Sequence, residues 1–146
     1  MDIAIIYTSM SGNTEELAEV IADRIKDNKG TCTMFRAGAL PLRLDEFDIV
    51  LFGSYTWGQG KTPRQMRNAL RTILKENQMP INKAAVFGSG DETFPHFCRA
   101  VDEISYHLKK YDVDVWESTL KIEQSCRGSQ IKDVYKWIDD ITGGIE

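Results

Sequence analysis

Short apolar runs with the pattern of β-strands alternate with amphipathic helical patterns from one end of this chain to the other. The strand patterns lie at residues 3–7, 31–36, 48–53, 83–87 and from 113 onward, and the helical patterns lie at residues 14–27, 63–74, 97–108 and 131–141. Such alternation is typical of a parallel sheet that helices cover on both faces. The sequence therefore predicts an α/β fold whose binding loops lie at the carboxyl ends of the strands.

The composition of the chain limits the functional classes that it can belong to. Its 146 residues predict a single domain, and its net charge of −4 argues against nucleic-acid binding and favours docking to a basic partner surface. No apolar run approaches the roughly 18 residues of a membrane span, and the start lacks the basic segment of a signal peptide, so we expect no membrane partner. The three cysteines, Cys32, Cys98 and Cys126, lack metal-ligand spacing, which is typical of reduced thiols in a cytoplasmic protein.

The loop after the first strand pattern has the chemistry of an anion site. It offers four hydroxyl groups and one side-chain amide, from Thr8, Ser9, Ser11, Thr14 and Asn13. A helical pattern begins at once after this loop, and a helix N-terminus presents unpaired backbone N–H groups and a partial positive charge. Because the loop holds no lysine or arginine, neutral dipoles would bind the anion, and Gly12 allows the backbone to approach it closely.

The same stretch resembles the signature of the flavodoxin family, position by position: Ile5-Ile6-Tyr7-x-Ser9-x-x-Gly12-x-Thr14-x-x-x-Ala18-x-x-Ile21. In that family the loop holds the 5′-phosphate of FMN. The resemblance therefore implies that FMN is the cofactor and that the loop binds its phosphate. Hydroxyl residues are common at the position of Met10, whose backbone N–H could still serve. The residues assigned to the cofactor in this loop are Thr8, Ser9, Met10, Ser11, Gly12, Asn13 and Thr14.

The resemblance spans the whole chain and implies its architecture. Residues 1–146 are expected to form one flavodoxin-like FMN-binding domain, a doubly wound five-stranded parallel sheet of order 2-1-3-4-5 with helices on both faces. About ten residues separate Val113 from Ile122, which leaves no room for the insertion that long-chain flavodoxins carry. The chain is therefore similar to the short-chain type, and in particular to flavodoxins of Gram-positive bacteria.

The loop after the third strand pattern carries an aromatic residue where flavodoxins cover the inner face of the isoalloxazine ring. Trp57 matches that position. The resemblance implies that the peptide of Gly58 flips when the flavin gains one electron, so that its carbonyl accepts a hydrogen bond from flavin N5–H; glycine makes such a flip easy. The residues assigned to the cofactor in this loop are Ser54, Tyr55, Thr56, Trp57, Gly58 and Gln59.

The end of this loop also admits a nucleotide-triphosphate interpretation. Gly60-Lys61-Thr62 resembles the end of a P-loop, but the full pattern requires glycine at the position of Tyr55, and Trp57 fills the space that a phosphate wrap needs. We therefore favour the flavin interpretation. Pro63 is expected to be the first residue of the following helix, with Thr62 as its cap.

The third loop follows the fourth strand pattern and resembles the flavodoxin loop in which a tyrosine usually stacks on the outer face of the flavin. Phe94 stands at that position and keeps the aromatic face without the hydroxyl. Negative charge at Asp91 and Glu92 would disfavour the anionic fully reduced flavin and lower the second reduction potential, and for Glu92 the alternative is a solvated loop carboxylate. The residues assigned to the cofactor here are Ser89, Gly90, Asp91, Phe94, Phe97 and Cys98.

Taken together, the resemblance implies a low-potential one-electron carrier with non-covalently bound FMN. Its partners would be a flavodoxin or ferredoxin-NADP reductase and acceptor redox enzymes, docking transiently to a monomer, and no residue is needed for acid–base catalysis. The alternative is a flavodoxin-like enzyme or activator, either an NAD(P)H quinone reductase or the flavoprotein that activates manganese ribonucleotide reductase. A phospho-receiver domain is disfavoured, because Thr8, Ser9 and Ser54 stand where its acidic residues belong.

One stretch departs from the acidic character usual near the flavin. Lys61, Arg64, Arg67, Arg71 and Lys75 oppose Glu76 alone between residues 54 and 76, while the rest of the chain holds 13 basic and 21 acidic residues. Three of the arginines share one helix face by their spacing. This pattern is compatible with an ordinary solvated helix face or with a patch that selects a partner.

Overall fold

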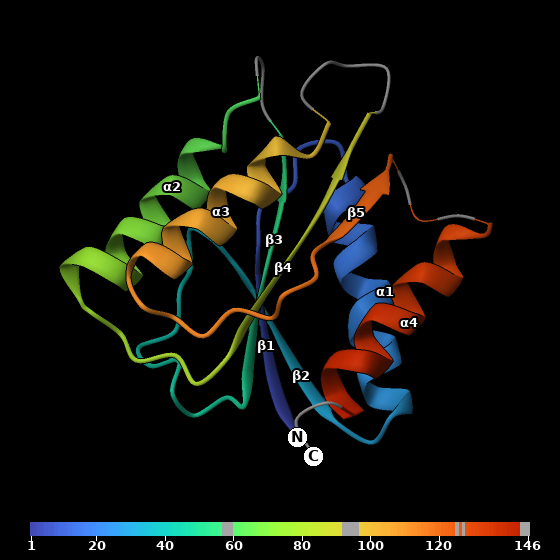
Figure 1. The fold of residues 1–146 in the computed structure, drawn as a ribbon, viewed down its shortest axis with the longest axis horizontal. Helices are drawn as coiled ribbons and strands as arrows, with labels where there is room; N and C mark the ends of the chain where they lie inside the picture. The colour runs from blue at the N-terminus through green and yellow to red at the C-terminus, as the bar shows by residue number, and fades with distance from the viewer. Residues whose placement is uncertain (57–59, 92–96, 125, 127, 144–146) are drawn as a thin grey trace.

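A five-stranded parallel sheet in the order β2-β1-β3-β4-β5 organises the molecule (Figure 1). The computed structural model describes residues 1–56, 60–91, 97–124, 126 and 128–143. The strands are β1 (Asp2–Tyr7), β2 (Thr31–Arg36), β3 (Ile49–Tyr55), β4 (Ala84–Gly90) and β5 (Leu120–Glu123). The predicted α/β fold and its strand order of 2-1-3-4-5 are confirmed.

Helices cover both faces of this sheet (Figure 1). α1 (Asn13–Asp27) and α4 (Gln130–Gly143) pack side by side on one face. The other face carries α3 (Arg99–Lys110) and α2 (Arg64–Leu70), which continues directly into a π-helical segment, η1 (Arg71–Glu76). No helix within the described ranges has both the length and the apolar character needed to cross a bilayer.

The core consists of two layers because successive strand residues point to opposite faces. In β1, Ile3 and Ile5 belong to the apolar cluster under α1 and α4, whereas Ala4 and Ile6 belong to the cluster under α2 and α3. β3 and β4 alternate in the same way, and their apolar side chains are fully buried. Parallel strands buried on both faces need such continuous apolar runs, which is why the sequence patterns located them.

The fifth strand differs from the prediction, which placed its start at Val113. Val115 makes an isolated bridge to Ala84, and the strand itself begins only at Leu120. Between them the chain leaves the sheet, and the carbonyl of Ser118 accepts a hydrogen bond of 3.0 Å from the indole N–H of Trp137. A side chain from α4 thus takes a carbonyl that a continuous strand would use in its ladder.

The start of α2 also corrects the prediction. Pro63 is its N-terminal flanking residue, in an extended conformation, and no side chain caps the helix. The expected cap, Thr62, instead donates its hydroxyl hydrogen bond to Glu103 Oε2 of α3, at 2.9 Å. Thr62 therefore ties the entrance of α2 to its neighbouring helix.

Candidate functional site

The strand register brings the three predicted loops to one edge of the sheet. Tyr7 lies beside Gly53 at the ends of β1 and β3, and Tyr55 lies beside Ser89 at the ends of β3 and β4. Because all strands run in parallel, the segments that leave β1, β3 and β4 emerge next to each other (Figure 1).

Two buried hydroxyl pairs join these segments. Thr8 Oγ1 lies 3.0 Å from Ser54 Oγ, and Thr14 Oγ1 lies 2.7 Å from Ser89 Oγ. All four side chains are buried. Ser54 donates its own proton to the carbonyl of Tyr55 at 2.7 Å, so Thr8 is the donor in the first pair. The hydroxyl protons of Thr8 and Ser54 are thus committed to protein oxygens.

The backbone of the first loop presents a row of free donors. From Ser9 to Thr14, the backbone N–H groups have no hydrogen-bond partner among the described residues. The N–H of Glu15, next along, donates to Ser9 Oγ at 3.3 Å, and that of Glu16 donates to the carbonyl of Gly12 at 2.9 Å. The donor set at the N-terminus of α1 is therefore the kind that binds an anion, and it fits a phosphate.

Gly12 gives this loop its shape. Its φ of +91° lies in the left-handed region, directly before α1, where it occupies the capping position without a side-chain hydrogen bond. A Cβ added there would meet nothing within 4 Å, so the need for glycine is conformational rather than steric.

A charged cluster lies beneath the start of α1. Arg36 Nη2 lies 3.1 Å from both carboxylate oxygens of Glu15, and its guanidinium carbon lies 5.4 Å from the ring centroid of Tyr7. The Tyr7 hydroxyl donates to Glu15 Oε1 at 3.3 Å. Burial first, and the negative charge of Glu15 second, raise the pKa of Tyr7. Arg36 therefore compensates an acidic side chain that would otherwise repel an anion at the same helix end.

The second loop is tied to α3. Thr56 Oγ1 accepts a hydrogen bond of 3.0 Å from the backbone N–H of Ala100, in the first turn of that helix. Tyr55 ends β3 and is half-buried. The predicted aromatic wall, Trp57, and its neighbours Gly58 and Gln59 lie outside the described residues.

The third loop begins with a close packing of backbone and thiol. A Cβ on Gly90 would lie 3.0 Å from Cys98 Sγ and 3.1 Å from the Cys98 nitrogen. Cys98 is buried and adopts a left-handed conformation before α3, and Phe97 packs against the apolar cluster on that face. Asp91 is half-buried, whereas Phe94 and Glu92 lie outside the described residues.

Comparison with known proteins shows the family to which this chain belongs. The sequence profile described as flavodoxin matches residues 5–137. The chain belongs to the flavodoxin family. It is 37% identical over 133 residues to probable flavodoxin 1 of Bacillus subtilis, covering 84% of each chain, and 31% identical over 139 residues to a flavodoxin of Nitratidesulfovibrio vulgaris, covering 93% of each.

Solved flavodoxin structures share the fold over its full length. Oxidised flavodoxin 1 from Bacillus cereus superposes with a TM-score of 0.84 at 28% identity, covering 100% of both chains. A short-chain flavodoxin associated with a bacterial microcompartment reaches a TM-score of 0.89 at 20% identity. The expected similarity to short-chain and Gram-positive flavodoxins is thereby confirmed.

Family membership distinguishes an electron-transfer protein from an enzyme. Flavodoxins are electron-transfer proteins rather than enzymes, so the interpretation as a quinone reductase falls away. Membership also implies a flavin cofactor, and the free N–H groups of the first loop are compatible with the phosphate of such a cofactor.

The sequence missed the contacts that hold the flavodoxin loops together. The pairing of Thr14 with Ser89 joins residues 75 positions apart, and the pairing of Thr8 with Ser54 joins residues 46 apart. Arg36 was not singled out either, although it ends β2 directly beside Tyr7 in the register. Strand order was the available signal, because it brings the ends of β1, β2, β3 and β4 together.

Proposed function

We propose that this flavodoxin is a low-potential one-electron carrier that binds FMN non-covalently within one domain, residues 1–146. The observation that carries the proposal is the row of free backbone N–H groups from Ser9 to Thr14 at the N-terminus of α1. A cofactor with a terminal phosphate monoester suits this cradle, because no lysine or arginine stands in the loop to neutralise a larger charge.

The residues that would hold FMN divide between phosphate and ring. The phosphate would be bound by the N–H groups of the first loop, Met10 and Gly12 included, and by the side chains of Ser9, Ser11, Asn13 and Thr14. Thr8 and Ser54 would act behind this layer, since their hydroxyl protons are already donated to protein oxygens, and so would Thr56, whose oxygen accepts from Ala100. In the pair of Thr14 with Ser89 either hydroxyl can be the donor, so one proton stays free for the phosphate.

The ring would lie between the second and third loops. Trp57 and Phe94 would form its two flat walls, Tyr55, Gly58 and Gln59 would contact its edge from one loop, and the other loop would contribute the residues Ser89, Gly90, Asp91, Phe97 and Cys98. Bound FMN would supply the redox chemistry by gaining and losing one electron at a time. The chain's own residues would orient the ring and exclude water from its buried faces.

Two classes of partner would exchange electrons with this carrier. A flavodoxin or ferredoxin-NADP reductase would deliver electrons, and acceptor redox enzymes would receive them in transient complexes with a monomeric, cytoplasmic carrier. Brief docking is consistent with the role, because a shuttle must leave one partner before it can meet the next.

Reconstitution with FMN and with riboflavin tests the cofactor. We expect FMN to bind with quenching of its fluorescence, riboflavin to bind at least about 100-fold more weakly because it lacks the phosphate, and Thr14→Val to weaken FMN binding by about tenfold or more. Thr142→Val is the matched control, because that hydroxyl donates to the carbonyl of Ile138 within α4, away from the loops.

The redox role has a separate readout. Spectroelectrochemical titration of the FMN-loaded protein should give two well-separated one-electron steps, and a ferredoxin-NADP reductase with NADPH should reduce it. Equal binding of riboflavin and FMN would overturn the phosphate assignment, whereas a colourless protein that rejects both flavins would overturn the carrier proposal.

A further inference from the structure

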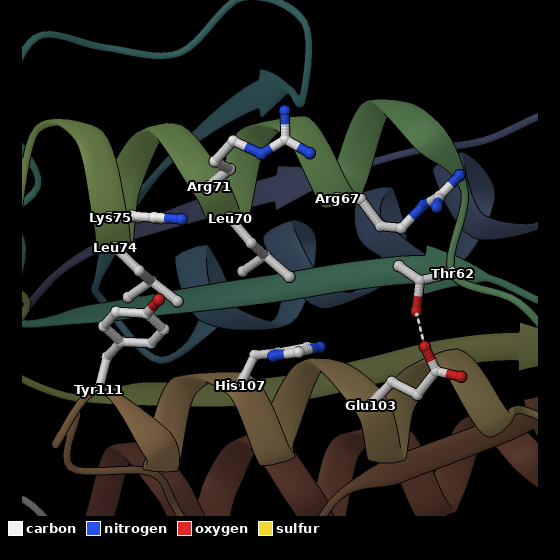
Figure 2. Close-up of a pocket in the computed structure, with 9 residues that line it drawn as sticks. All are labelled: Thr62, Arg67, Leu70, Arg71, Leu74, Lys75, Glu103, His107 and Tyr111. Atoms are coloured by element: carbon white, nitrogen blue, oxygen red, sulfur yellow. Dashed lines mark hydrogen bonds between the residues drawn. The ribbon is translucent and has the colours of Figure 1, made fainter.

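A groove separates α2 and η1 from α3, on the face of the sheet opposite α1 and α4 (Figure 2). It encloses about 250 Å³. Leu70 and Leu74 point from one bank towards His107 and Tyr111 on the other, and the hydrogen bond between Thr62 and Glu103 closes one end (Figure 2). The floor is therefore apolar, and one end is fixed.

The groove continues beyond the part drawn in Figure 2. A second hollow of about 480 Å³ shares Leu74, Lys75 and Tyr111 with the first, and its lining includes Met79 and Ile81. The two hollows together follow the length of α2 and η1, roughly 20 Å at 1.5 Å per residue. An elongated groove of this length, lined by apolar and polar side chains, suits a chain segment better than a compact small molecule.

The bank formed by α2 and η1 is cationic and unneutralised. Residues 61–75 hold five basic residues and no acidic residue, while the rest of the chain holds 13 basic and 22 acidic residues. These five side chains, Lys61, Arg64, Arg67, Arg71 and Lys75, are exposed and form no ion pair with any described residue. Their charge is therefore available to an anionic partner.

The backbone of this bank is also unusual. η1 is a π-helix, in which Asn77 donates its N–H to the carbonyl of Thr72, five residues earlier, at 2.9 Å. π-Helical turns are rare and are found frequently at functional sites, because the ordinary α-helix is the more stable alternative. Here the π turn carries Arg71, Leu74 and Lys75, which all line the groove.

We propose that the groove between α2–η1 and α3 is the docking surface for an acidic amphipathic segment of a partner protein. Apolar side chains of the segment would contact Leu70 and Leu74, and its carboxylates would pair with Arg67, Arg71 and Lys75. Charge complementarity selects this occupant, because a basic or neutral segment would leave the three cations unpaired. None of the residues assigned to the cofactor is among those that line the groove, so the proposal does not depend on the cofactor.

NMR titration of the full chain with designed peptides tests the proposal. The probe is the 12-residue peptide Glu-Glu-Leu-Glu-Glu-Leu-Leu-Glu-Glu-Leu-Glu-Glu, with two controls in which lysine replaces every glutamate or serine replaces every leucine. At low ionic strength we expect the acidic peptide alone to bind tightly, with shift changes confined to the groove, among them those of Arg67, Leu70 and His107.

Charge-reversal variants locate the binding. Arg67→Glu with Arg71→Glu should weaken binding of the acidic peptide at least about tenfold. Lys132→Glu with Lys136→Glu is the matched control, since these two lysines are also exposed and four residues apart, but lie on α4. We expect this control pair to leave the affinity unchanged.

Several outcomes would overturn the proposal. These are absence of binding, equal weakening by both pairs of reversals, and equal binding of the serine peptide, which would mean that the apolar floor is not used. Citrate producing the same shifts at the same affinity would identify a small-anion site instead. Dilution of the chain alone shifting the groove resonances would identify a second copy as the occupant.

Discussion

The two helical layers of this flavodoxin use their charges in opposite ways. Between α1 and α4, Arg24 binds both carboxylate oxygens of Asp139 at 3.0 and 2.8 Å, and Asn28 donates to the same carboxylate at 2.8 Å. The guanidinium of Arg24 also lies 4.5 Å from the ring centroid of Tyr135. Between α2–η1 and α3 lies a groove, and the cations along its rim pair with no described residue.

The difference does not arise in the core. Both faces of the sheet bury continuous apolar clusters, with Leu17 and Ile21 of α1 as fully buried as Ile73 of η1 and Ile104 of α3. It arises at the outer surface, where the ion pair of Arg24 with Asp139 joins the helices of one layer and the other layer leaves charge exposed. Because the cores of both layers are packed alike, the surface charges of α1 and α4 can stabilise the fold, while those of α2 and η1 remain available for association.

Alanine at Gly53 or Gly88 should have the largest effect on stability, and the two variants test whether the two faces of the sheet are packed equally well. A Cβ on Gly53 would lie 2.1 Å from the Phe87 ring on the α1–α4 side, and one on Gly88 would lie 2.4 Å from Val101 Cγ2 and 2.6 Å from the Ser54 carbonyl oxygen on the α3 side. We expect either alanine variant to lower the free energy of unfolding in urea by about 3 kcal/mol.

The control for these variants is Gly38→Ala, because a Cβ at that position meets nothing within 4 Å. Gly88→Ala should be the more severe of the two, since a backbone carbonyl yields less readily than a side-chain ring. A Gly88 variant as stable as the Gly38 control would show that the α2–α3 face is loosely packed, which would break the comparison.

Reversing one charge in each layer should change the melting temperature by a smaller amount, and in opposite directions in the two layers. Arg24→Glu places a second carboxylate beside Asp139 and should lower the melting temperature by about 5 °C. Arg71→Glu creates favourable pairs with Arg67 and Lys75, each four residues away on the helix surface, and should raise it by about 1–2 °C.

Differential scanning calorimetry at low and high salt measures both variants. Added salt should reduce both shifts, because the groups are partly or fully exposed. Destabilisation by Arg71→Glu would mean that the cations of η1 already have a structural role, and the contrast between the layers would be lost.

The smallest expected effect is the contribution of the Asp139 carboxylate to stability, which depends on pH. Hydrogen bonds from Arg24 first, and from Asn28 second, lower the pKa of Asp139 below its usual value. Since the folded pKa is depressed, the contribution to stability is present above the ordinary carboxyl pKa of about 4 and is lost as the pH falls through the lowered value.

Asp139→Asn should therefore melt slightly below the unchanged protein at pH 7, and the gap should close as the pH is lowered through that window. Thermal melts by circular dichroism at several pH values measure the gap. A gap that stays constant down to strongly acidic pH would show that Asp139 acts through packing and not through its charge.

Much of the fold was predictable from local patterns, and the exceptions have long-range causes. Apolar runs located β1, β3 and β4, because parallel strands buried on both faces leave little choice of residue, and the alternating pattern of residues 31–36 located the edge strand β2. The start of β5 was wrong because Trp137, distant in sequence, takes the Ser118 carbonyl. Thr62 was wrongly expected to cap α2 because the sequence does not show that Glu103 lies opposite.

The functional sites also have parts that depend on local sequence and parts that depend on long-range packing. The first loop could be predicted, since its glycine, its hydroxyls and the helix that follows are adjacent in the chain. The groove could not, because its width depends on how α2 and α3 are spaced and on the π turn of η1. The basic stretch from Lys61 to Lys75 was visible, but a sequence does not show which cations are already neutralised by neighbours.

The buried hydroxyl pairs also bear on the order in which the molecule folds. Thr14 meets Ser89 only after β4 has joined the sheet, and Thr8 meets Ser54 only after β3 has done so. An early intermediate made of β1, α1 and β2 would contain the entire loop from Ser9 to Thr14 without the partners that fix it. We therefore expect competence to capture an anion to arise late in folding, so that half-formed chains do not sequester cofactor.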